Sequence, residues 1–414
     1  MPRYITNIHI DKLYHLSDFD IPIADDAAPH LILTGRNGSG KTITLNAIAD
    51  FLDKVINDTS LNFLGYSKSI ENGKGKISQH LQGTPEYIEL QLSLERLKKL
   101  HDNLFGKINV DFGEDCGFIN KYAEGNFIIA FYEAARKTEI EEPKNPTKPE
   151  LQAKTEVRTL MTNQLLNFLS DLKIQEALAR NEQQVTDADK IRSWFVDFES
   201  VLKNLFEDSE LKLHFNYRDY TFYIETRGKS FKFTELSDGF SAIIDIIADL
   251  ILKMQKKDTL VMDYLKPGIV LIDEIETHLH LQLQKIVLPL LTGLFPNIQF
   301  IVTTHSPFVL SSLSDATAFD MEHRQTIANL SDYSYQALTE GYFGVSSDSN
   351  YTKARLEQLH GLIEKEQLTY EEKETVRQII DDFRKMSEVA SPALIGQFNK
   401  LLIDHSENIK SIIG

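Results

Sequence analysis

Three short apolar runs occur along the chain, and each is followed directly by glycine, acidic or polar residues. The runs are residues 30–34 (HLILT), 268–272 (GIVLI) and 298–303 (IQFIVT). Unbroken runs of this length, rich in Ile and Val, are typical of strands buried on both faces of a parallel sheet. Residues 42–52 and 278–294 carry apolar positions at three- and four-residue spacing, which predicts crossover helices. The pattern therefore predicts an α/β fold with a mostly parallel central sheet.

The segments between these runs have a different pattern. Residues 87–94 (YIELQLSL) and 126–131 (NFIIAF) are predicted as strands, and residues 71–75 (ENGKG) as a loop. Further strands are expected at about 212–233. An antiparallel β subdomain beside the parallel sheet is expected within residues 1–140.

The composition changes at residue 141, where EEPKNPTKPE predicts an exposed linker. Two amphipathic helical segments follow, over about 160–172 and 191–205, and residues 364–385 form a polar, charged helical pattern. No internal repeat is present, and no heptad pattern is long enough for an extended coiled-coil arm. The predicted parts are an N-terminal core (1–140), a helical insertion (141–210), a C-terminal core (211–334) and a helical C-terminal extension (335–414).

Composition narrows the functional classes. The 414 residues carry 61 acidic against 44 basic side chains, a formal net charge of -17, so that any nucleic-acid contact would need a local basic patch. The single cysteine, Cys116, excludes an intrachain disulfide and every zinc site built on paired cysteines, and it favours a reducing compartment. The most apolar stretch, from Ala242, is interrupted by Asp245 and Asp249, and the N-terminus lacks a signal-peptide pattern. We expect a cytoplasmic protein without a membrane partner.

A glycine-rich segment between the first predicted strand and helix fits the phosphate-binding pattern G-x-x-x-x-G-K-[ST] at every position. In such a loop, backbone N–H groups surround phosphate oxygens and the helix N-terminus adds its positive end. Lys41 is expected to contact the β- and γ-phosphates of ATP as a catalytic residue, and Thr42 to bind Mg²⁺. The predicted nucleotide-binding residues of this phosphate loop are Gly35, Arg36, Asn37, Gly38, Ser39, Gly40, Lys41 and Thr42.

The second apolar run ends in two consecutive carboxylates, Asp273 and Glu274. Parallel strands place their carboxyl ends at one edge of the sheet, so both should lie beside the phosphate loop. Asp273 is expected to complete the Mg²⁺ shell, and Glu274 to act as the general base for the attacking water. Alone, two acids at a strand end would be ordinary solvated caps.

The segment Leu236-Ser237-Asp238-Gly239-Phe240 (the signature segment) precedes an apolar helix. It resembles the signature sequence of ABC-type ATPases, with Asp and Phe in place of the usual Gly and Gln. The resemblance implies that Ser237 and Gly239 bind the γ-phosphate held by a second subunit. An isolated LSDG would be explained as a helix N-cap.

The same resemblance extends to His305, which follows the third apolar run and matches the histidine that contacts the γ-phosphate and catalytic water in that family. The family's glutamine loop has three candidates, Gln79, Gln82 and Gln91, with no basis for choosing among them. His278 and His280 could suggest a metal pair, but their segment is predicted to start a helix, where positions i and i+2 diverge.

The stretches LIDEIETHLHLQLQKIVLPLL and FPNIQFIVTTHSPFVLSS resemble the soluble overcoming-lysogenisation-defect, PtuA-like and AriA-like ATPases of bacterial anti-phage defence, with SMC- and RecF-type ATPases more distant. The resemblance covers about residues 1–60 and 232–334. Relatives often carry a Toprim nuclease domain. Only about 80 residues follow Ser334, too few for that domain, so we expect the effector, a nuclease or toxin, to be a separate protein.

The resemblance therefore implies a P-loop NTPase of ABC type that forms a homodimer, or a higher even-numbered oligomer, through ATP and Mg²⁺ sites. It would regulate a separate effector in response to a nucleic-acid or phage-protein trigger. One alternative is a DNA-repair or chromosome-maintenance ATPase that clamps nucleic acid. Another is an ATP-locked scaffold without catalysis. The clamp would use a cluster of basic residues in the first third of the chain, formed by Lys68, Lys74, Lys76, Lys98, Lys99, Lys107 and Lys121.

Overall fold

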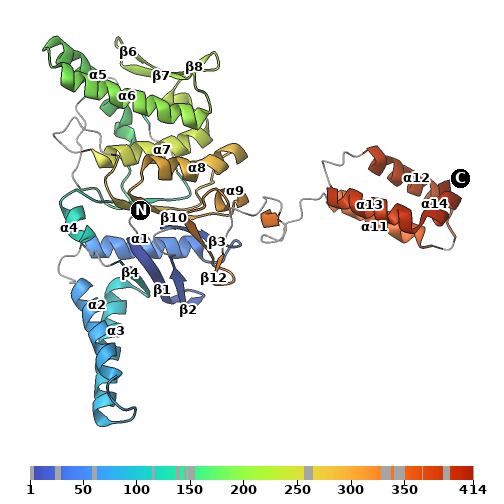
Figure 1. Cartoon of the computed structure of the whole chain (residues 1–414), viewed down its shortest axis with the longest axis horizontal. Helices are drawn as coiled ribbons and strands as arrows, with labels where there is room; N and C mark the ends of the chain where they lie inside the picture. The colour runs from blue at the N-terminus through green and yellow to red at the C-terminus, as the bar shows by residue number, and fades with distance from the viewer. Residues whose placement is uncertain are drawn as a thin grey trace. The chain divides into compact units, whose positions relative to one another are not determined.

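The computed structural model divides the chain into two compact units, Met1–Tyr333 and Ser334–Gly414 (Figure 1). The described residues are 4–23, 29–57, 63–113, 117–136, 140–143, 147, 154–255, 264–327, 337–339, 350–365, 367–385 and 392–413. Cys116 and most of the predicted linker at 141–150 lie outside them.

The first unit is built around a six-stranded sheet with the order β12-β11-β3-β10-β9-β5. Five strands run parallel, and β12 pairs antiparallel with β11 at one edge. The three apolar runs form the three central strands, and every residue in them is buried. The predicted mostly parallel sheet is therefore confirmed. The strands are β3 (His30–Thr34), β5 (Ile128–Tyr132), β9 (Gly268–Ile272), β10 (Ile298–Thr303), β11 (Ala316–Asp320) and β12 (Gln325–Ile327).

Two antiparallel sheets accompany the central one. The first, of order β2-β1-β4, consists of β1 (Ile5–Leu13), β2 (Leu16–Pro22) and β4 (Ile108–Phe112). The second, of order β6-β7-β8, consists of β6 (Lys212–Asn216), β7 (Thr221–Thr226) and β8 (Lys229–Lys232). The buried Gln299 side chain ties β10 to the first of them, since its Oε1 accepts from the Ile5 N–H at 2.8 Å and its Nε2 donates to the Ile5 carbonyl at 2.9 Å.

Helices cover both faces of the central sheet. In Figure 1, α1 (Lys41–Asn57) lies on one side, and α7 (Asp238–Met254) and α8 (Leu281–Leu294) lie on the other. The two acids that interrupt the apolar run of α7 are buried, and Asp249 forms an ion pair with Lys253 at 2.8 Å. None of the helices within the described ranges is long and apolar enough to cross a bilayer.

The helical insertion contains α5 (Leu165–Asn181) and α6 (Val185–Phe206), which pack against each other. An aromatic pair joins the two helices, since Phe168 of α5 meets Trp194 of α6 edge to face with ring centroids 5.9 Å apart. Shorter elements complete the unit: α4 (Phe118–Ala123), α9 (Pro307–Leu310) and the 3₁₀ turns η2 (Thr162–Gln164) and η3 (Phe233–Glu235).

The prediction for residues 71–94 was wrong. The expected loop lies inside α2 (Phe63–Ile77), and the expected strand lies inside α3 (Pro85–Phe105), which pairs with α2 as a helical hairpin (Figure 1). A Cβ on Gly73 would lie 3.1 Å from a Leu94 methyl group, so glycine here permits close helix packing.

The second unit is helical, as predicted for the C-terminal extension. Its helices are α11 (Asn350–Ile363), α12 (Tyr370–Lys385), α13 (Pro392–Asp404) and α14 (Ser406–Ile413). Leu359, Val376 and Ile379 are completely buried at the centre of its own apolar cluster. The unit therefore has an apolar core of its own.

Candidate functional site

The phosphate loop connects the end of β3 to the start of α1, as the sequence predicted. Gly35, Gly38 and Gly40 have φ angles of 129°, 83° and 98°, conformations that side-chain-bearing residues rarely adopt. A Cβ on Gly35 would also lie 2.9 Å from Ser39 Oγ, whereas a Cβ on Gly38 would meet only open space. At Gly38 the loop thus presents open backbone beside the α1 N-terminus, which suits an anionic phosphate.

Lys41 is the buried cation of this loop. Its Nζ donates to the Gly35 carbonyl at 2.8 Å and to the Arg36 carbonyl at 3.2 Å. Burial lowers the pKa of the ammonium, and the nearby carboxylates of Glu274, Glu276 and Asp273 oppose that shift. A positive charge surrounded by loop carbonyls can exchange those contacts for phosphate oxygens.

Asp273 follows β9 and contacts Thr42, which lies in the first turn of α1. Thr42 Oγ1 donates to Asp273 Oδ1 at 3.1 Å, and Thr303 Oγ1 at the end of β10 donates to the same oxygen at 2.6 Å. Hydroxyl and carboxylate oxygens are the ligands that Mg²⁺ prefers. Thr42 and Asp273 therefore have the chemistry of Mg²⁺ ligands, and their role as metal ligands stays a prediction.

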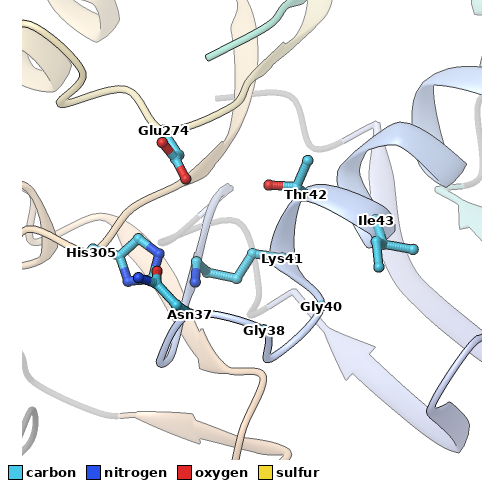
Figure 2. Close-up of a pocket in the computed structure, with 8 residues that line it drawn as sticks. All are labelled: Asn37, Gly38, Gly40, Lys41, Thr42, Ile43, Glu274 and His305. Carbon is cyan, nitrogen blue, oxygen red and sulfur yellow. The ribbon is translucent and has the colours of Figure 1, made fainter. Parts of the chain in front are cut away.

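Glu274 lies beside this pair with its backbone in the left-handed region, at φ 42°. Its N–H donates to Thr303 Oγ1 at 2.7 Å, and its carbonyl accepts from Arg136 Nη2 at 3.1 Å. Neither Thr303 nor Arg136 was singled out from the sequence. Figure 2 shows the Glu274 carboxylate across the pocket from Thr42.

His305 follows β10 and is half-buried. Its backbone N–H donates to the carboxylate of Glu276, and Thr304 Oγ1 donates to the same carboxylate at 2.7 Å. Burial and the charge of Lys41 lower the pKa of the His305 imidazole. The ring is therefore neutral at pH 7 and keeps one N–H donor and one acceptor.

The ends of three strands thus bring several of the predicted residues around one pocket (Figure 2). The lining residues are Asn37, Gly38, Gly40, Lys41, Thr42, Ile43, Glu274 and His305. Arg36 instead lies exposed, with its guanidinium 3.6 Å from the Glu322 carboxylate.

The signature segment does not line this pocket. Ser237 is the N-cap of α7, is exposed, and makes no side-chain capping bond. Gly239 is buried, and an added Cβ would lie 2.8 Å from the His278 carbonyl. Phe240, one of the departures from the ABC pattern, stacks on Phe206 of α6 with ring centroids 4.3 Å apart. The phenylalanine therefore anchors the signature segment to the helical insertion.

The remaining polar candidates lie elsewhere. Gln79, Gln82 and Gln91 are exposed on or beside the helical hairpin. His278 and His280 precede α8 rather than starting it, because His278 has φ 67° and His280 is an extended N-cap. Within the described ranges, no group of three or more His, Cys, Asp or Glu side chains could hold a metal ion.

Of the missed residues Glu276 and Arg136, only Glu276 had a signal in the sequence. Glu276 belongs to the same acidic cluster as Asp273 and Glu274, at the spacing D-E-I-E. Arg136 lies four residues beyond Tyr132, at the end of β5, which pairs with β9 in the register Tyr132 to Ile272. Only that pairing, which depends on tertiary structure, places it near Glu274.

Comparison with known proteins finds relatives among Septu and retron proteins. The chain is 24% identical over 411 residues to "Septu protein PtuA" of Bacillus mycoides (strain KBAB4), covering 94% of this chain and 52% of that protein. It is 36% identical over 103 residues to "Retron Ec83 probable ATPase" of Escherichia coli, covering 25% of this chain and 19% of that protein. The chain thus spans about half the length, or less, of these curated relatives.

Among solved structures, the SMC head domain from Thermotoga maritima matches with 13% identity and a TM-score of 0.35, over 77% of this chain and 94% of that one. A family model described as "AAA domain, putative AbiEii toxin, Type IV TA system" matches residues 31–311, from the phosphate-loop strand to beyond His305. Since that match spans more than half of the sequence, the chain belongs to this AAA-domain family, AAA_21.

Proposed function

We propose that this chain binds ATP with Mg²⁺ and hydrolyses it in a dimer that regulates a separate effector of anti-phage defence. The observation that carries the ATPase proposal is the meeting of Lys41, Thr42, Glu274 and His305 around one pocket beside Asp273. Nucleotide hydrolysis needs two oxygen ligands for a metal ion, a cation that binds phosphate and a carboxylate that activates water.

Each side chain would then have one task. Lys41 would exchange its carbonyl contacts for β- and γ-phosphate oxygens, and Thr42 with Asp273 would hold Mg²⁺, which neutralises phosphate charge. Glu274 would orient the attacking water and accept its proton. The neutral His305 would donate a hydrogen bond toward the γ-phosphate or the water.

The dimer is proposed from the position of the signature segment. Ser237 is exposed and does not line the pocket of its own chain, although a hydroxyl at a helix N-terminus suits an anion. A second copy facing the phosphate loop would supply Ser237 and Gly239 to the bound nucleotide, so each site would be complete only in the dimer.

The defence role rests on relatives that are named after the Septu and retron systems. This chain spans only about half of the Septu relative. The effector would be a nuclease or toxin, and the trigger would be nucleic acid or a phage protein. Both are therefore part of the proposal.

The nucleic-acid clamp has less support. On the helical hairpin, the exposed Lys74, Lys76, Lys98 and Lys99 share the surface with exposed Glu86, Glu89 and Glu95. Such mixed charge forms no basic stripe. The Lys68 side chain lies outside the described residues. A scaffold that never hydrolyses ATP is opposed by Glu274, which a purely structural nucleotide site would not need.

The test compares two substitutions in the purified chain. Glu274→Gln should slow ATP turnover by roughly 10²- to 10⁴-fold while leaving binding of a fluorescent ATP analogue intact. Lys41→Ala should weaken that binding itself by about tenfold or more, since each charge-assisted hydrogen bond contributes roughly 1.5 to 3 kcal/mol. The matched control is Lys54→Ala, an exposed lysine in the last turn of the same helix. Normal turnover in the Glu274 variant would reject the proposed base.

A further inference from the structure

Arg136 is a guanidinium enclosed behind the turn that carries Glu274. Its Nη2 donates to the Glu274 carbonyl at 3.1 Å and to the Ile275 carbonyl at 3.4 Å. Its Nε and Nη1 are buried and have no hydrogen-bond partner among the residues that the structure describes. A buried charged group with unpaired donors is costly, so its presence here needs a reason other than stability.

The turn that Arg136 supports is strained. Glu274 has φ 42°, a conformation that costs a residue other than glycine roughly 1–3 kcal/mol unless neighbours fix it. The neighbours act at both ends of the residue, since Thr303 Oγ1 accepts its N–H at 2.7 Å and Arg136 binds its carbonyl. The direction of the Glu274 side chain therefore depends on these two contacts.

Glu276 supports the opposite side of the pocket. Its two carboxylate oxygens accept from the His305 N–H and from Thr304 Oγ1, which fixes the turn after β10. Burial lowers the pKa of Arg136, and the charge of Glu276 opposes this shift more than that of any other carboxylate. One residue of this pair contacts the Glu274 backbone and the other contacts the His305 backbone.

We propose that Arg136 and Glu276 are positioning residues that act as one unit and hold Glu274 and His305 in the mutual orientation that ATP hydrolysis requires. This inference rests on the proposed ATPase function. Neither residue lines the pocket, so neither is expected to contact the nucleotide. Their loss should change the rate of the chemical step rather than nucleotide affinity.

The experiment uses the full chain with Arg136→Met, Arg136→Lys, Glu276→Gln and the Arg136→Met/Glu276→Gln double variant. Arg158→Met and Glu133→Gln are matched controls, because these residues form an exposed ion pair of 3.4 Å and their side-chain hydrogen bonds within the described residues reach neither Glu274 nor His305. The first readout is kcat, compared with the Kd of a non-hydrolysable ATP analogue. The second is amide hydrogen exchange without nucleotide at Glu274, Ile275 and His305.

Arg136→Met and Glu276→Gln should each lower kcat by roughly 10- to 100-fold, the usual effect of removing a group that orients a catalytic ligand, with Kd changed less than about threefold. Arg136→Lys should restore part of the rate, since an ammonium can still donate to a carbonyl. The double variant should lose less than the product of the single losses, because the residues act as a unit. Exchange should be faster at Glu274 and Ile275 in Arg136→Met, and at His305 in Glu276→Gln.

The outcomes separate this inference from the ATPase proposal. If Glu274→Gln abolishes turnover while Arg136→Met and Glu276→Gln keep the wild-type kcat, the positioning role is wrong and the ATPase stands. If the unaltered chain shows no turnover, the ATPase proposal fails, and the positioning unit with it, even where exchange changes. Multiplicative losses in the double variant would reject the coupling. Should Arg136→Met not fold, Arg136→Lys and Glu276→Gln decide the question.

Discussion

At Gly239 the signature segment leaves no space for a side chain. An added Cβ would lie 2.8 Å from the carbonyl oxygen of His278, a backbone atom that cannot rotate away. His278 is itself held at φ 67°, so the two turns fix each other. A single methyl group at this position should therefore disturb both the signature segment and the start of α8.

Gly239→Ala is expected to destabilise the first unit by about 1–3 kcal/mol, the usual cost of forcing an extra group into a packed site. Denaturant unfolding followed by circular dichroism measures this. The control is Gly293→Ala in α8, where an added Cβ meets nothing within 4 Å; this change should raise stability by up to about 1 kcal/mol. Equal stability of the Gly239 variant and the unaltered chain would mean that the two turns are not in contact in solution.

At the scale of the element, β3 contains a histidine that is sensitive to acid. His30 is buried, and its Nδ1 accepts the Phe300 N–H at 3.1 Å, which requires the neutral ring. Burial lowers its pKa to about 4 from the ordinary 6.5. Between these values the unfolded chain binds the proton and the folded chain does not. The titration of His30 therefore leaves stability unchanged above about pH 6.5, and it lowers stability as the pH falls from 6.5 to 4.

His30→Asn tests this effect, because the amide oxygen can still accept the Phe300 N–H without titrating. The stability difference between the unaltered chain and the variant should shrink or reverse by up to roughly 3 kcal/mol between pH 7 and pH 4, since each pKa unit corresponds to about 1.4 kcal/mol. Urea unfolding at several pH values provides the measurement. Parallel pH profiles for the two chains would show that His30 does not titrate in this way.

The pattern of buried positions within each element explains which elements could be predicted from the sequence. The runs at β3, β9 and β10 are buried on both faces, so an unbroken apolar pattern gave their bounds directly. In α3, the exposed Ile88 and Leu92 create a false two-residue alternation. The helix instead turns Tyr87, Leu90, Leu94 and Leu97 to its less exposed side, at spacings of three and four.

The candidate site was predictable wherever a residue adjoins a motif. Asp273 and Glu274 directly follow β9, and the phosphate loop that leads to Lys41 and Thr42 follows β3, so the edge of the parallel sheet brings them together. Arg136 could not be found in this way, because its contact depends on β5 being the neighbour of β9, and β5 has no motif of its own.

At the scale of the whole molecule, the proposed site is divided between two chains. Lys41 of one chain and Ser237 of the other would contact the same nucleotide, so no other residue of the same chain could take over the role of either. This division makes a prediction that no single-chain active site shares. Two inactive variants, one altered at Lys41 and the other at Ser237, should restore activity to each other when mixed.

In a mixed dimer of Lys41→Ala and Ser237→Glu chains, one site combines both defects, and the other combines the intact phosphate loop of one chain with the intact signature segment of its partner. If subunits exchange freely, half of the dimers are mixed and each has one working site, so turnover should recover to about a quarter of that of the unaltered protein.

Ser237→Glu places a negative charge against the γ-phosphate, and Ser230→Glu, at an exposed serine of β8, is the control that should remain active alone. Turnover is measured by phosphate release before and after mixing, with size-exclusion chromatography in Mg-ATP to show dimers. If both variants fold, the Ser237 variant binds ATP, and mixed dimers form without any recovered turnover, the signature segment does not complete a partner's site and the shared-site dimer is wrong.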